Sequence, residues 1–146
     1  MQANSPPRIL ITGATGFIGK RLLYKLDAMG YSVRCMVRPP EKLNLPFPLE
    51  NEPEVVAGDL LNPASLKNAL HGIDTAYYLV HSMGGKSLRE RKAFEERDRV
   101  AAQNFVNAAN QSGLSRLIYL GGLGEATDNI SHHLASRQEV GKILVP

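Results

Sequence analysis

The chain has 146 residues, of which 43% are hydrophobic and 21% charged, with a net charge of +3. This length suits a single domain, and the balanced charge excludes a disordered chain. No uncharged apolar run approaches the roughly 18 residues that a membrane-spanning helix needs, and residues 1–7 lack the basic and apolar regions of a signal peptide. A single cysteine, Cys35, excludes an intrachain disulfide. We expect a soluble, cytoplasmic protein in which residues 1–7 form a flexible tail.

The distribution of charge gives no sign of a nucleic-acid partner. The densest charged segment, residues 89–99, alternates in sign. Its pairs Lys92/Glu96 and Glu95/Arg99 have the i,i+4 spacing that supports an exposed helix face. Because there is no basic stripe with interleaved aromatic residues, we expect no binding of nucleic acid.

The first elements in chain order form a unit of strand, glycine loop and helix. Residues 8–12 have the apolar run of a short buried strand. Residues 17–29 carry apolar side chains at helical spacing, and this helix is expected to end at Gly30. Residues 31–37, rich in side chains that favour β-structure, predict a second strand that stops before two prolines.

A proline-containing loop over residues 41–53 leads to the third predicted strand, residues 54–57. A helix over residues 62–71 is expected to begin with Asn62 and a proline, since asparagine caps free N–H groups and proline suits the first turn. Residues 75–80 predict a fourth strand, whose continuous apolar character fits a sheet covered on both faces.

A long helix is predicted over residues 88–111. Its inward-facing stripe is expected to consist of Phe94, Ala101, Phe105 and Ala108. A short apolar run and a last helical segment follow this helix in the sequence.

Residues 117–120 predict a fifth strand, and the final helix begins near Ser131 and runs to the end of the chain. Strands that alternate with helices are typical of βαβ units. The sequence therefore predicts one α/β domain over residues 8–146, doubly wound around a parallel sheet of about five strands.

The loop between the first strand and the first helix carries the motif Thr-Gly-Ala-Thr-Gly-Phe-Ile-Gly, residues 12–19. The pyrophosphate of a dinucleotide needs N–H donors at a helix N-terminus and no Cβ atoms in its way. We expect Gly13 to allow the tight turn, Gly16 the close approach of the pyrophosphate, and Gly19 the packing of helix against strand. The alternative is a glycine-containing turn without a ligand, and the surrounding βαβ unit favours the dinucleotide.

This motif resembles the glycine loop of the short-chain dehydrogenase/reductase superfamily, in its extended and atypical branches. The resemblance continues along nearly the whole chain: Gly58-Asp59-Leu60 resembles the acidic turn that contacts adenine, and residues 76–82 resemble the strand and loop beside the nicotinamide ribose. The chain is most similar to an atypical NAD(P)-binding, complex-I-subunit-like group, in which the run Tyr-Leu-Val-His-Ser is typical. The resemblance implies a Rossmann fold.

The resemblance also implies which residues bind the cofactor. They form three groups along the dinucleotide. These groups are Gly13, Thr15, Gly16, Phe17, Ile18 and Gly19 around the pyrophosphate, Asp59 and Leu60 at the adenine, and Val80, His81 and Ser82 beside the nicotinamide half.

The residue that closes the second strand distinguishes the two nicotinamide cofactors. A carboxylate binds the 2′-hydroxyl of NAD, whereas an arginine accommodates the 2′-phosphate of NADP. This chain has Arg38 at that place and no acid until Glu41. We therefore expect NADP, with NAD as the second option, and tighter binding of NADPH than of NADH. Two alternatives stay open: Arg38 is a surface arginine without a ligand, or Arg34, on the same sheet face by counting in twos, makes a second phosphate contact.

Catalysis is the weaker part of the resemblance. Reductases of this superfamily use a Tyr-x-x-x-Lys pair on the helix after the fifth strand. Here His133 and Arg137 have that spacing, and two glycines replace the usual serine or threonine after the strand. Histidine moves protons near neutral pH, and Arg137 is suited to contacting the ribose. An arginine beside a histidine lowers its pKa and cannot itself release a proton, so a cofactor-binding helix without chemistry is favoured over a catalytic pair.

Other reactive side chains predict no further site. His132 and His133 would point about 100° apart on a helix, so we expect no metal site. Cys35 is expected to be a small buried group, and Ser82 has no base beside it in the sequence. The tyrosines of the strands, Tyr77, Tyr78 and Tyr119, are interpreted as strand packing.

The sequence predicts an NADP-binding Rossmann domain of an oxidoreductase or epimerase that acts on a carbonyl or hydroxyl compound. The alternative is a non-catalytic module that binds NADP in a regulatory or structural role. The resemblance implies further strands and a substrate-binding segment after the fifth strand, so we expect a C-terminally truncated domain that is inactive alone. The substrate is unknown, and the oligomeric state, a homo-oligomer included, stays open.

Overall fold

A computed structural model of the chain describes residues 7–82, 85–124 and 130–145. Its strands are β1 (Arg8–Thr12), β2 (Ser32–Val37), β3 (Glu54–Ala57), β4 (Thr75–Tyr78) and β5 (Arg116–Tyr119). Its helices are α1 (Phe17–Ala28), α2 (Pro63–Leu70), α3 (Leu88–Ser112) and α4 (His132–Leu144). The predicted alternation of strands and helices is confirmed.

The strands form one five-stranded sheet in the order β3-β2-β1-β4-β5. Every pairing is parallel, and β1 lies in the middle, where Thr12 pairs with Met36 of β2 on one side and Tyr78 of β4 on the other. The chain winds outward from β1 first in one direction and then in the other. The doubly wound α/β fold predicted from the sequence is therefore confirmed, and its reversal point lies between β1 and β4.

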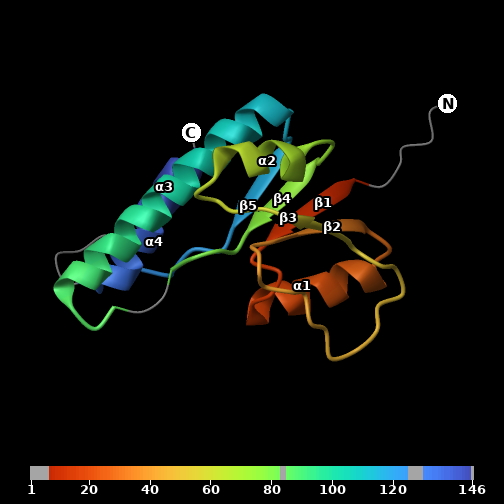
Figure 1. Cartoon of the computed structure of the whole chain (residues 1–146), viewed down its shortest axis with the longest axis horizontal. Coiled ribbons are helices and arrows are strands. Elements are labelled where there is room, and N and C mark those ends of the chain that lie inside the picture. The colour runs from red at the N-terminus through yellow and green to blue at the C-terminus, as the bar shows by residue number, and fades with distance from the viewer. Residues whose placement is uncertain (1–6, 83–84, 125–129, 146) are drawn as a thin grey trace.

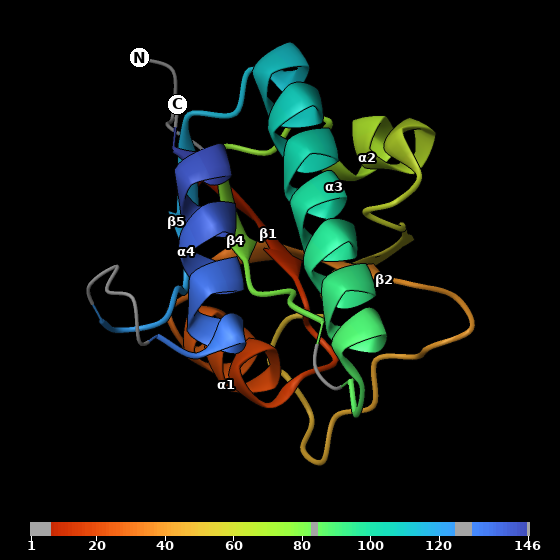
Figure 2. The ribbon, with the colours of Figure 1, turned by 90° about the vertical axis from the view of Figure 1, so that its left-hand side faces the viewer.

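The helices cover the two faces of the sheet unequally. Figures 1 and 2 place α2, α3 and α4 on one face and α1 on the other. The larger core lies under the three helices and includes Leu10, Tyr78 and Phe105, with the Tyr78 and Phe105 rings edge to face at a centroid distance of 5.2 Å. The smaller core lies under α1 and includes Leu23 and Cys35. Cys35 is fully buried as predicted, and burial raises the pKa of its thiol to about 12.

Helix ends follow local signals in the sequence. Ser87 caps α3: its Oγ accepts from the Glu90 N–H while the Glu90 carboxylate accepts from the Ser87 N–H, a reciprocal capping box. Gly113 ends α3 with a φ of 76°, in the left-handed region that glycine adopts without strain. Gly30, which follows α1, has a φ of 77°, so the predicted end of that helix is confirmed.

Several boundaries differ from the prediction by one or two residues. β2 begins at Ser32 rather than at residue 31, β4 ends at Tyr78 rather than at residue 80, and α4 ends at Leu144. The expected cap of α2 is wrong in its chemistry: Asn62 occupies the capping position, but its side chain makes no capping hydrogen bond. The backbone carbonyl of Asn62 accepts from Ser65 Oγ, at 2.8 Å.

The surface of α3 also differs from the prediction. The i,i+4 pairs of opposite charge do not form; Arg99 pairs with Glu96 at i,i+3, with a shortest N–O distance of 2.6 Å. Glu95 lies 3.6 Å from His132 of α4, so packing between the two helices redirects its side chain. Of the predicted inward stripe, Ala101 and Phe105 are buried, whereas Phe94 and Ala108 are only partly so. No helix in the described part of the chain is long and apolar enough to cross a membrane.

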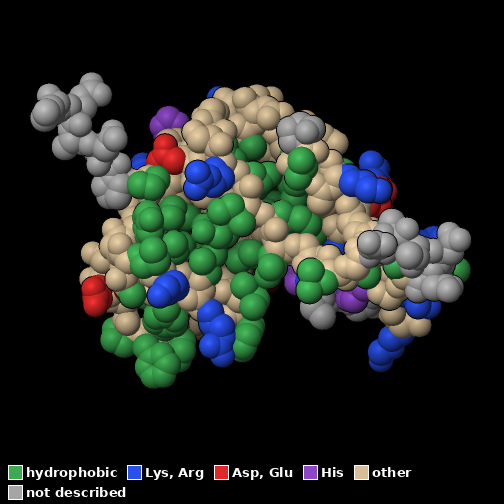
Figure 3. Space-filling model, turned by 180° about the vertical axis from the view of Figure 1, so that it is seen from behind, with side chains coloured by type: hydrophobic (Ala, Val, Ile, Leu, Met, Phe, Trp, Pro, Cys, Tyr) green, Lys and Arg blue, Asp and Glu red, His purple; other side chains and the backbone are tan. Residues whose placement is uncertain are grey.

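The face of the sheet that α1 covers is open over β4 and β5. Tyr77, Leu79 and Ile118 are half-buried there, and Leu120 is 52% exposed. Figure 3 shows hydrophobic side chains gathered in one broad area on the side seen from behind. The sequence-based expectation of a sheet covered on both faces therefore holds for β1 and β2 and fails for this part of the sheet.

Candidate functional site

The three glycines of the loop after β1 lie in different surroundings: Gly13 and Gly19 are closely packed, and Gly16 is open. Gly13 has a φ of 79°, and a Cβ there would lie 3.1 Å from the Leu79 carbonyl group. A Cβ at Gly19 would collide with the Gly13 carbonyl oxygen and lie 2.8 Å from Ala14 Cα, so helix and strand meet at this point. A Cβ at Gly16 would meet only the Gly13 carbonyl oxygen, at 3.4 Å. Gly13 and Gly19 are thus required by the fold, and Gly16 is not.

Gly16 is also the capping residue of α1, whose N-terminus carries no counter-charge. No side chain caps this end of α1, and its first turn contains no acidic residue. N–H groups at an uncapped helix N-terminus attract anions. Phe17 and Ile18 are exposed beside it, at 70% and 46%, and the Arg21 guanidinium lies 4.2 Å from the centre of the Phe17 ring. The loop presents N–H donors together with apolar and cationic surface.

Thr12 joins the ends of β1 and β4 next to this loop. Its buried Oγ1 donates to the Tyr77 carbonyl at 3.1 Å and accepts from the Leu79 N–H at 3.4 Å. The residues that follow β4 are thereby held against the glycine loop, at the point where the winding of the sheet reverses. Ligands of open α/β sheets bind at this point. The half-buried residues Val80, His81 and Ser82, assigned from the sequence to the nicotinamide half, lie here.

Arg38, directly after β2, meets the same loop through Glu41. Arg38 Nη2 donates to Glu41 Oε1 at 3.2 Å, and Thr15 Oγ1 donates to Glu41 Oε2 at 3.3 Å. The side chains of Arg38 and Glu41 remain 63% and 46% exposed. Arg38 and Thr15, predicted to bind different parts of a dinucleotide, are therefore linked by a carboxylate for which the sequence analysis proposed no role.

Arg34 is not available for a phosphate, so the alternative that it makes a second phosphate contact is wrong. Its side chain is buried and donates from Nε to Glu54 at 2.9 Å. Its Nη1 donates to carbonyls at the C-terminal end of α2, those of Ala69 and His71 at 2.9 and 2.8 Å. The guanidinium compensates the negative end of the α2 dipole and fixes β3 to β2. Counting alternate residues along β2 predicted which face of the sheet Arg34 lies on. It did not predict that the guanidinium binds the C-terminal end of α2.

The predicted adenine-binding turn is tightly held by its own hydrogen bonds. Asp59 Oδ1 accepts from the Leu61 N–H at 2.9 Å, and the Asp59 N–H donates to Ser65 Oγ at 3.0 Å. Leu60 is buried in the larger core, and its carbonyl accepts from Asn104 of α3 at 2.8 Å. The contacts of Asp59 and Leu60 with adenine stay predictions.

His81 and Arg137 meet across the gap between the β4–α3 loop and α4. Arg137 Nη2 lies 3.1 Å from Nε2 and 3.3 Å from Nδ1 of the imidazole. A guanidinium only donates and is positively charged, so this contact disfavours the protonated imidazole. Burial, and then the charge of Arg137, hold the pKa of His81 below its ordinary value; His133 adds to this lowering, whereas Asp98 opposes it.

Two groups that the sequence analysis did not assign to the site hold this pair in place. Tyr119 donates from its hydroxyl to the Arg137 carbonyl at 3.0 Å. Asp98 of α3 accepts from the Ser82 N–H at 2.9 Å. The predicted strand packing of Tyr119 is confirmed, since its ring lies edge to face with Tyr78 at 6.0 Å, but its hydroxyl has this second role. No sequence motif marks Asp98, because its partner is a backbone group.

His133 lies on α4 with an exposed side chain, one helical turn before Arg137. The guanidinium of Arg137 contacts His81, a residue outside the predicted pair of His133 and Arg137. The described residues contain no group of three or more histidine, cysteine or acidic side chains arranged to hold a metal ion.

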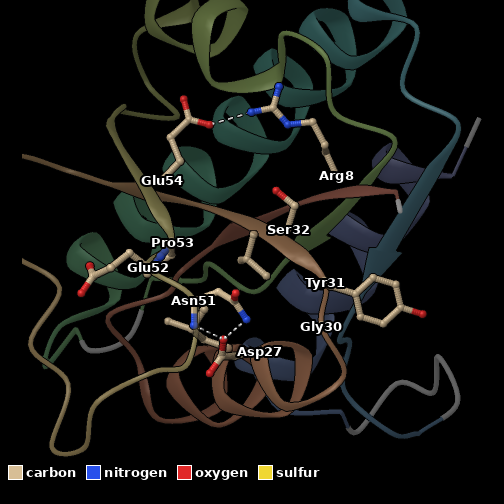
Figure 4. Close-up of a pocket in the computed structure, with 11 residues that line it drawn as sticks. Arg8, Asp27, Gly30, Tyr31, Ser32, Asn51, Glu52, Pro53 and Glu54 are labelled. Atoms are coloured by element: carbon tan, nitrogen blue, oxygen red, sulfur yellow. Dashed lines mark hydrogen bonds and ion pairs between the residues drawn. The ribbon is translucent and has the colours of Figure 1, made fainter. Parts of the chain in front are cut away.

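A separate cavity of about 260 Å³ lies at the opposite edge of the sheet, at the N-terminal ends of β1, β2 and β3 (Figure 4). Three of its charged groups are already paired: Arg8 binds Glu54 at 2.9 Å, and Asp27 binds the backbone and side-chain N–H groups of Asn51 at 2.8 and 3.2 Å. This cavity is remote from the glycine loop and from the ends of β1 and β4. It does not belong to the candidate site.

Comparison with known proteins agrees with this geometry. Residues 13–145 match the model of a family described as NAD(P)H-binding. The chain is 32% identical over 117 residues to a 3-beta-hydroxysteroid dehydrogenase of Mycolicibacterium neoaurum, a match that covers 77% of this chain and 31% of that protein. It is 31% identical over 130 residues to a ceramide reductase of Caulobacter vibrioides, covering 89% of this chain and 39% of that protein.

Among solved structures, a nucleoside-diphosphate-sugar epimerase from Staphylococcus aureus superimposes with a TM-score of 0.72 at 25% identity. That superposition covers 94% of this chain and 46% of the epimerase. The chain thus spans about a third of the length of the curated relatives that it matches. By sequence, fold and glycine loop, the chain belongs to the NAD(P)H-binding family, within the short-chain dehydrogenase/reductase superfamily.

Proposed function

We propose that the chain is the NADP-binding domain of an oxidoreductase or epimerase that acts on a carbonyl or hydroxyl compound. The observation that carries the proposal is the arrangement at the first glycine loop, where Gly16 leaves room above an uncapped helix N-terminus. A pyrophosphate fits this place because it needs N–H donors and no Cβ atom in its way. Gly13 and Gly19 shape the loop, while Thr15, Phe17 and Ile18 line it.

The preference for NADP is proposed from Arg38. Its exposed guanidinium follows the end of β2, where the 2′-position of a dinucleotide lies in folds of this class. A guanidinium suits a phosphate because it offers paired, charged hydrogen bonds. Asp59 and Leu60 would border the adenine, and NAD remains the second cofactor considered.

The nicotinamide ring would accept or donate a hydride, and the chain's own residues would orient it. Val80, His81 and Ser82 would border this half of the cofactor. His133 and Arg137 are proposed as the proton-moving and ribose-binding residues, in place of the tyrosine and lysine of related reductases. Arg137, whose Nη2 lies 3.1 Å from His81 Nε2, would act as a donor at this edge.

The second candidate function is a non-catalytic module that binds NADP in a regulatory or structural role. The contact between Arg137 and His81 favours it, since Arg137 is engaged by the chain itself and cannot release a proton. A turnover screen with NADPH and varied carbonyl compounds separates the two candidates. Turnover supports the enzyme, and binding without turnover on any of them supports the module.

Titration calorimetry with NADPH and NADH tests the premise that both candidates share. We expect NADPH to bind, more tightly than NADH, and Gly16→Ala to weaken NADPH binding about tenfold or more, because the new methyl group occupies the pyrophosphate's place. The fold should survive, since that Cβ meets only one atom, at 3.4 Å.

The matched control is Gly141→Ala on α4. A Cβ at Gly141 would also have its nearest neighbour at 3.4 Å, and this neighbour is an atom of the Tyr119 ring. This variant should bind NADPH like the unsubstituted chain. Absence of binding of either dinucleotide at millimolar concentration would overturn both candidate functions.

A further inference from the structure

Three side chains from separate segments converge beside the glycine loop: Thr15 before α1, and Arg38 and Glu41 after β2. One oxygen of the Glu41 carboxylate accepts from Arg38 and the other from Thr15, at 3.2 and 3.3 Å. The Glu41 N–H also donates to the Arg38 carbonyl at 2.9 Å, which closes a turn and fixes the two residues close together. Glu41 is therefore held between the guanidinium and the loop.

We infer that Glu41 is a specificity-determining residue that limits the preference of this site for NADP(H) over NAD(H). The inference rests on the proposed function, in which Arg38 meets the 2′-position of the ribose. A 2′-phosphate that binds Arg38 must share the guanidinium with the Glu41 carboxylate or displace it. A 2′-hydroxyl carries no charge and can donate a hydrogen bond to that same carboxylate.

Two effects of Glu41 oppose each other, and their sizes decide the sign. The carboxylate orients Arg38, which favours phosphate binding, but an exposed i,i+3 ion pair on mobile side chains contributes little. It also repels the phosphate, which carries up to two negative charges at a distance of a few ångströms. In water with 0.15 M salt this repulsion corresponds to about a fivefold change in affinity. Repulsion is the larger effect, so Glu41 disfavours the 2′-phosphate.

The test compares the chain with its E41Q variant, which keeps the size of the side chain and removes its charge. Dissociation constants are measured by calorimetry for NADPH and NADH. The pair 2′,5′-ADP (adenosine 2′,5′-bisphosphate) and 5′-AMP serves as a second probe, because these two nucleotides differ only in the 2′-phosphate. The control is E52Q, an equal loss of charge at an exposed residue on the opposite edge of the sheet.

We expect E41Q to raise the preference for NADPH over NADH, and for 2′,5′-ADP over 5′-AMP, by about fivefold. The gain should shrink when the salt concentration is raised from about 0.05 to 0.5 M, because the Debye length falls and the repulsion is screened more strongly. E52Q should leave both preferences within about twofold of the unsubstituted chain.

The inference and the proposed function fail in different ways. If the chain binds NADPH but E41Q leaves both preferences unchanged or lowers them, the inference is overturned and the proposed function stands. If E52Q raises the preferences as much as E41Q, net charge rather than the position of Glu41 is responsible, and the inference is again overturned. If the unsubstituted chain binds none of the four nucleotides, both are overturned.

Discussion

Arg137 lies against the imidazole of His81, and its charge is the largest cause, after burial, of the lowered pKa of the histidine. Both ring nitrogens are within 3.3 Å of Arg137 Nη2, so the ring has to offer a lone pair to a group that only donates. Burial and the arginine charge act in the same direction, toward the neutral imidazole, and only Asp98 and a backbone group oppose them.

Replacing Arg137 by methionine should raise the pKa of His81, because the variant keeps the bulk of the side chain and removes its charge. NMR titration of the imidazole protons measures the shift. The backbone carbonyl that Tyr119 holds is unaffected by this substitution. His133→Ala is the control: it should move the pKa of His81 in the same direction but less, since His133 contributes a smaller share of the lowering.

The same contact predicts how stability depends on pH. The pKa of His81 is lower in the folded chain than the ordinary 6.5, so the unfolded chain binds the proton more readily. The stabilisation from His81 is therefore complete above pH 6.5 and is lost as the pH falls through 6.5 toward the folded pKa. Urea unfolding across this range should show a shallower loss for Arg137→Met. An equally steep loss in the variant would contradict the role given to Arg137.

The sequence predicted the local shape of the glycine loop better than it predicted the long-range contacts of side chains. The roles predicted for Gly13 and Gly19 are confirmed by φ and by close approach, because a glycine requirement is local and visible in the spacing. The partners of Arg34 could not be predicted, since they are backbone carbonyls 34 to 37 residues away that converge only when α2 packs on the sheet. The position of Glu41 against Thr15 depends on long-range folding in the same way.

At the scale of elements, the loop between β2 and β3 is fastened to α1 at two points. Tyr24 exchanges two hydrogen bonds with the Phe47 backbone: its hydroxyl donates to the carbonyl at 2.7 Å and accepts from the N–H at 2.9 Å. Asp27 accepts from the N–H groups of Glu50 and Asn51, each at 2.8 Å. A proline-containing loop without regular structure thereby acquires a fixed path beside the helix.

Asp27→Asn should release the second fastening point, because an amide cannot accept both N–H groups as a carboxylate does. The amides of Glu50 and Asn51 should exchange hydrogen about fivefold faster or more. Tyr24→Phe is the matched control, since it should speed exchange at Phe47 and leave Glu50 and Asn51 protected. Unchanged exchange in Asp27→Asn would show that the loop does not depend on the carboxylate.

The attachment should also depend on acidity. The backbone N–H of Glu50, followed by Asn51, holds the pKa of Asp27 below the ordinary 3.8 despite its burial. The carboxylate thus favours the folded state above pH 3.8, and this contribution is lost as the pH falls through the lower pKa of the folded chain. The loop should stay attached at pH 5 and be released only in stronger acid.

The helices and strands were predicted well from local patterns in the sequence, whereas the side-chain contacts at their ends and surfaces were predicted less well. All five strands and four helices were found, because apolar periodicity and glycine ends are strong local signals. The predicted capping hydrogen bond of α2 was wrong, because Asn62 occupies the capping position but its side chain makes no such bond. The ion pairs of α3 were wrong because spacing along one helix does not include a second helix, here α4 with His132.

At the scale of the whole molecule, the two layers around the sheet differ in thickness. Three helices cover one face, while α1 and the fastened loop cover part of the other. Leu66 of α2 is fully buried under the thicker layer, whereas Leu120, just after β5, is 52% exposed on the open side. The same side-chain type therefore experiences both environments in one chain.

The substitutions Leu66→Ala and Leu120→Ala compare these environments directly. Leu66→Ala should lower the free energy of unfolding by about 2 to 5 kcal/mol, through lost burial and the cavity left behind. Leu120→Ala should cost less than about 0.5 kcal/mol, because the leucine is already in contact with water. Chemical denaturation of dilute samples provides both values. A loss at Leu120 close to that at Leu66 would mean that another surface covers this face in solution.

The central position of β1 has a consequence for the order in which this chain can assemble during synthesis. β1 leaves the ribosome before β2 and β4, yet one of its two neighbours in the sheet is β4, and the hydrogen bond from Thr12 to Tyr77 joins residues 65 positions apart. Until β4 emerges, the most buried strand of the sheet has only β2 beside it. Such non-local parallel pairing slows folding, because a long segment must be ordered before its contacts form. β1 thus gains neighbours on both sides only after β4 has been synthesised.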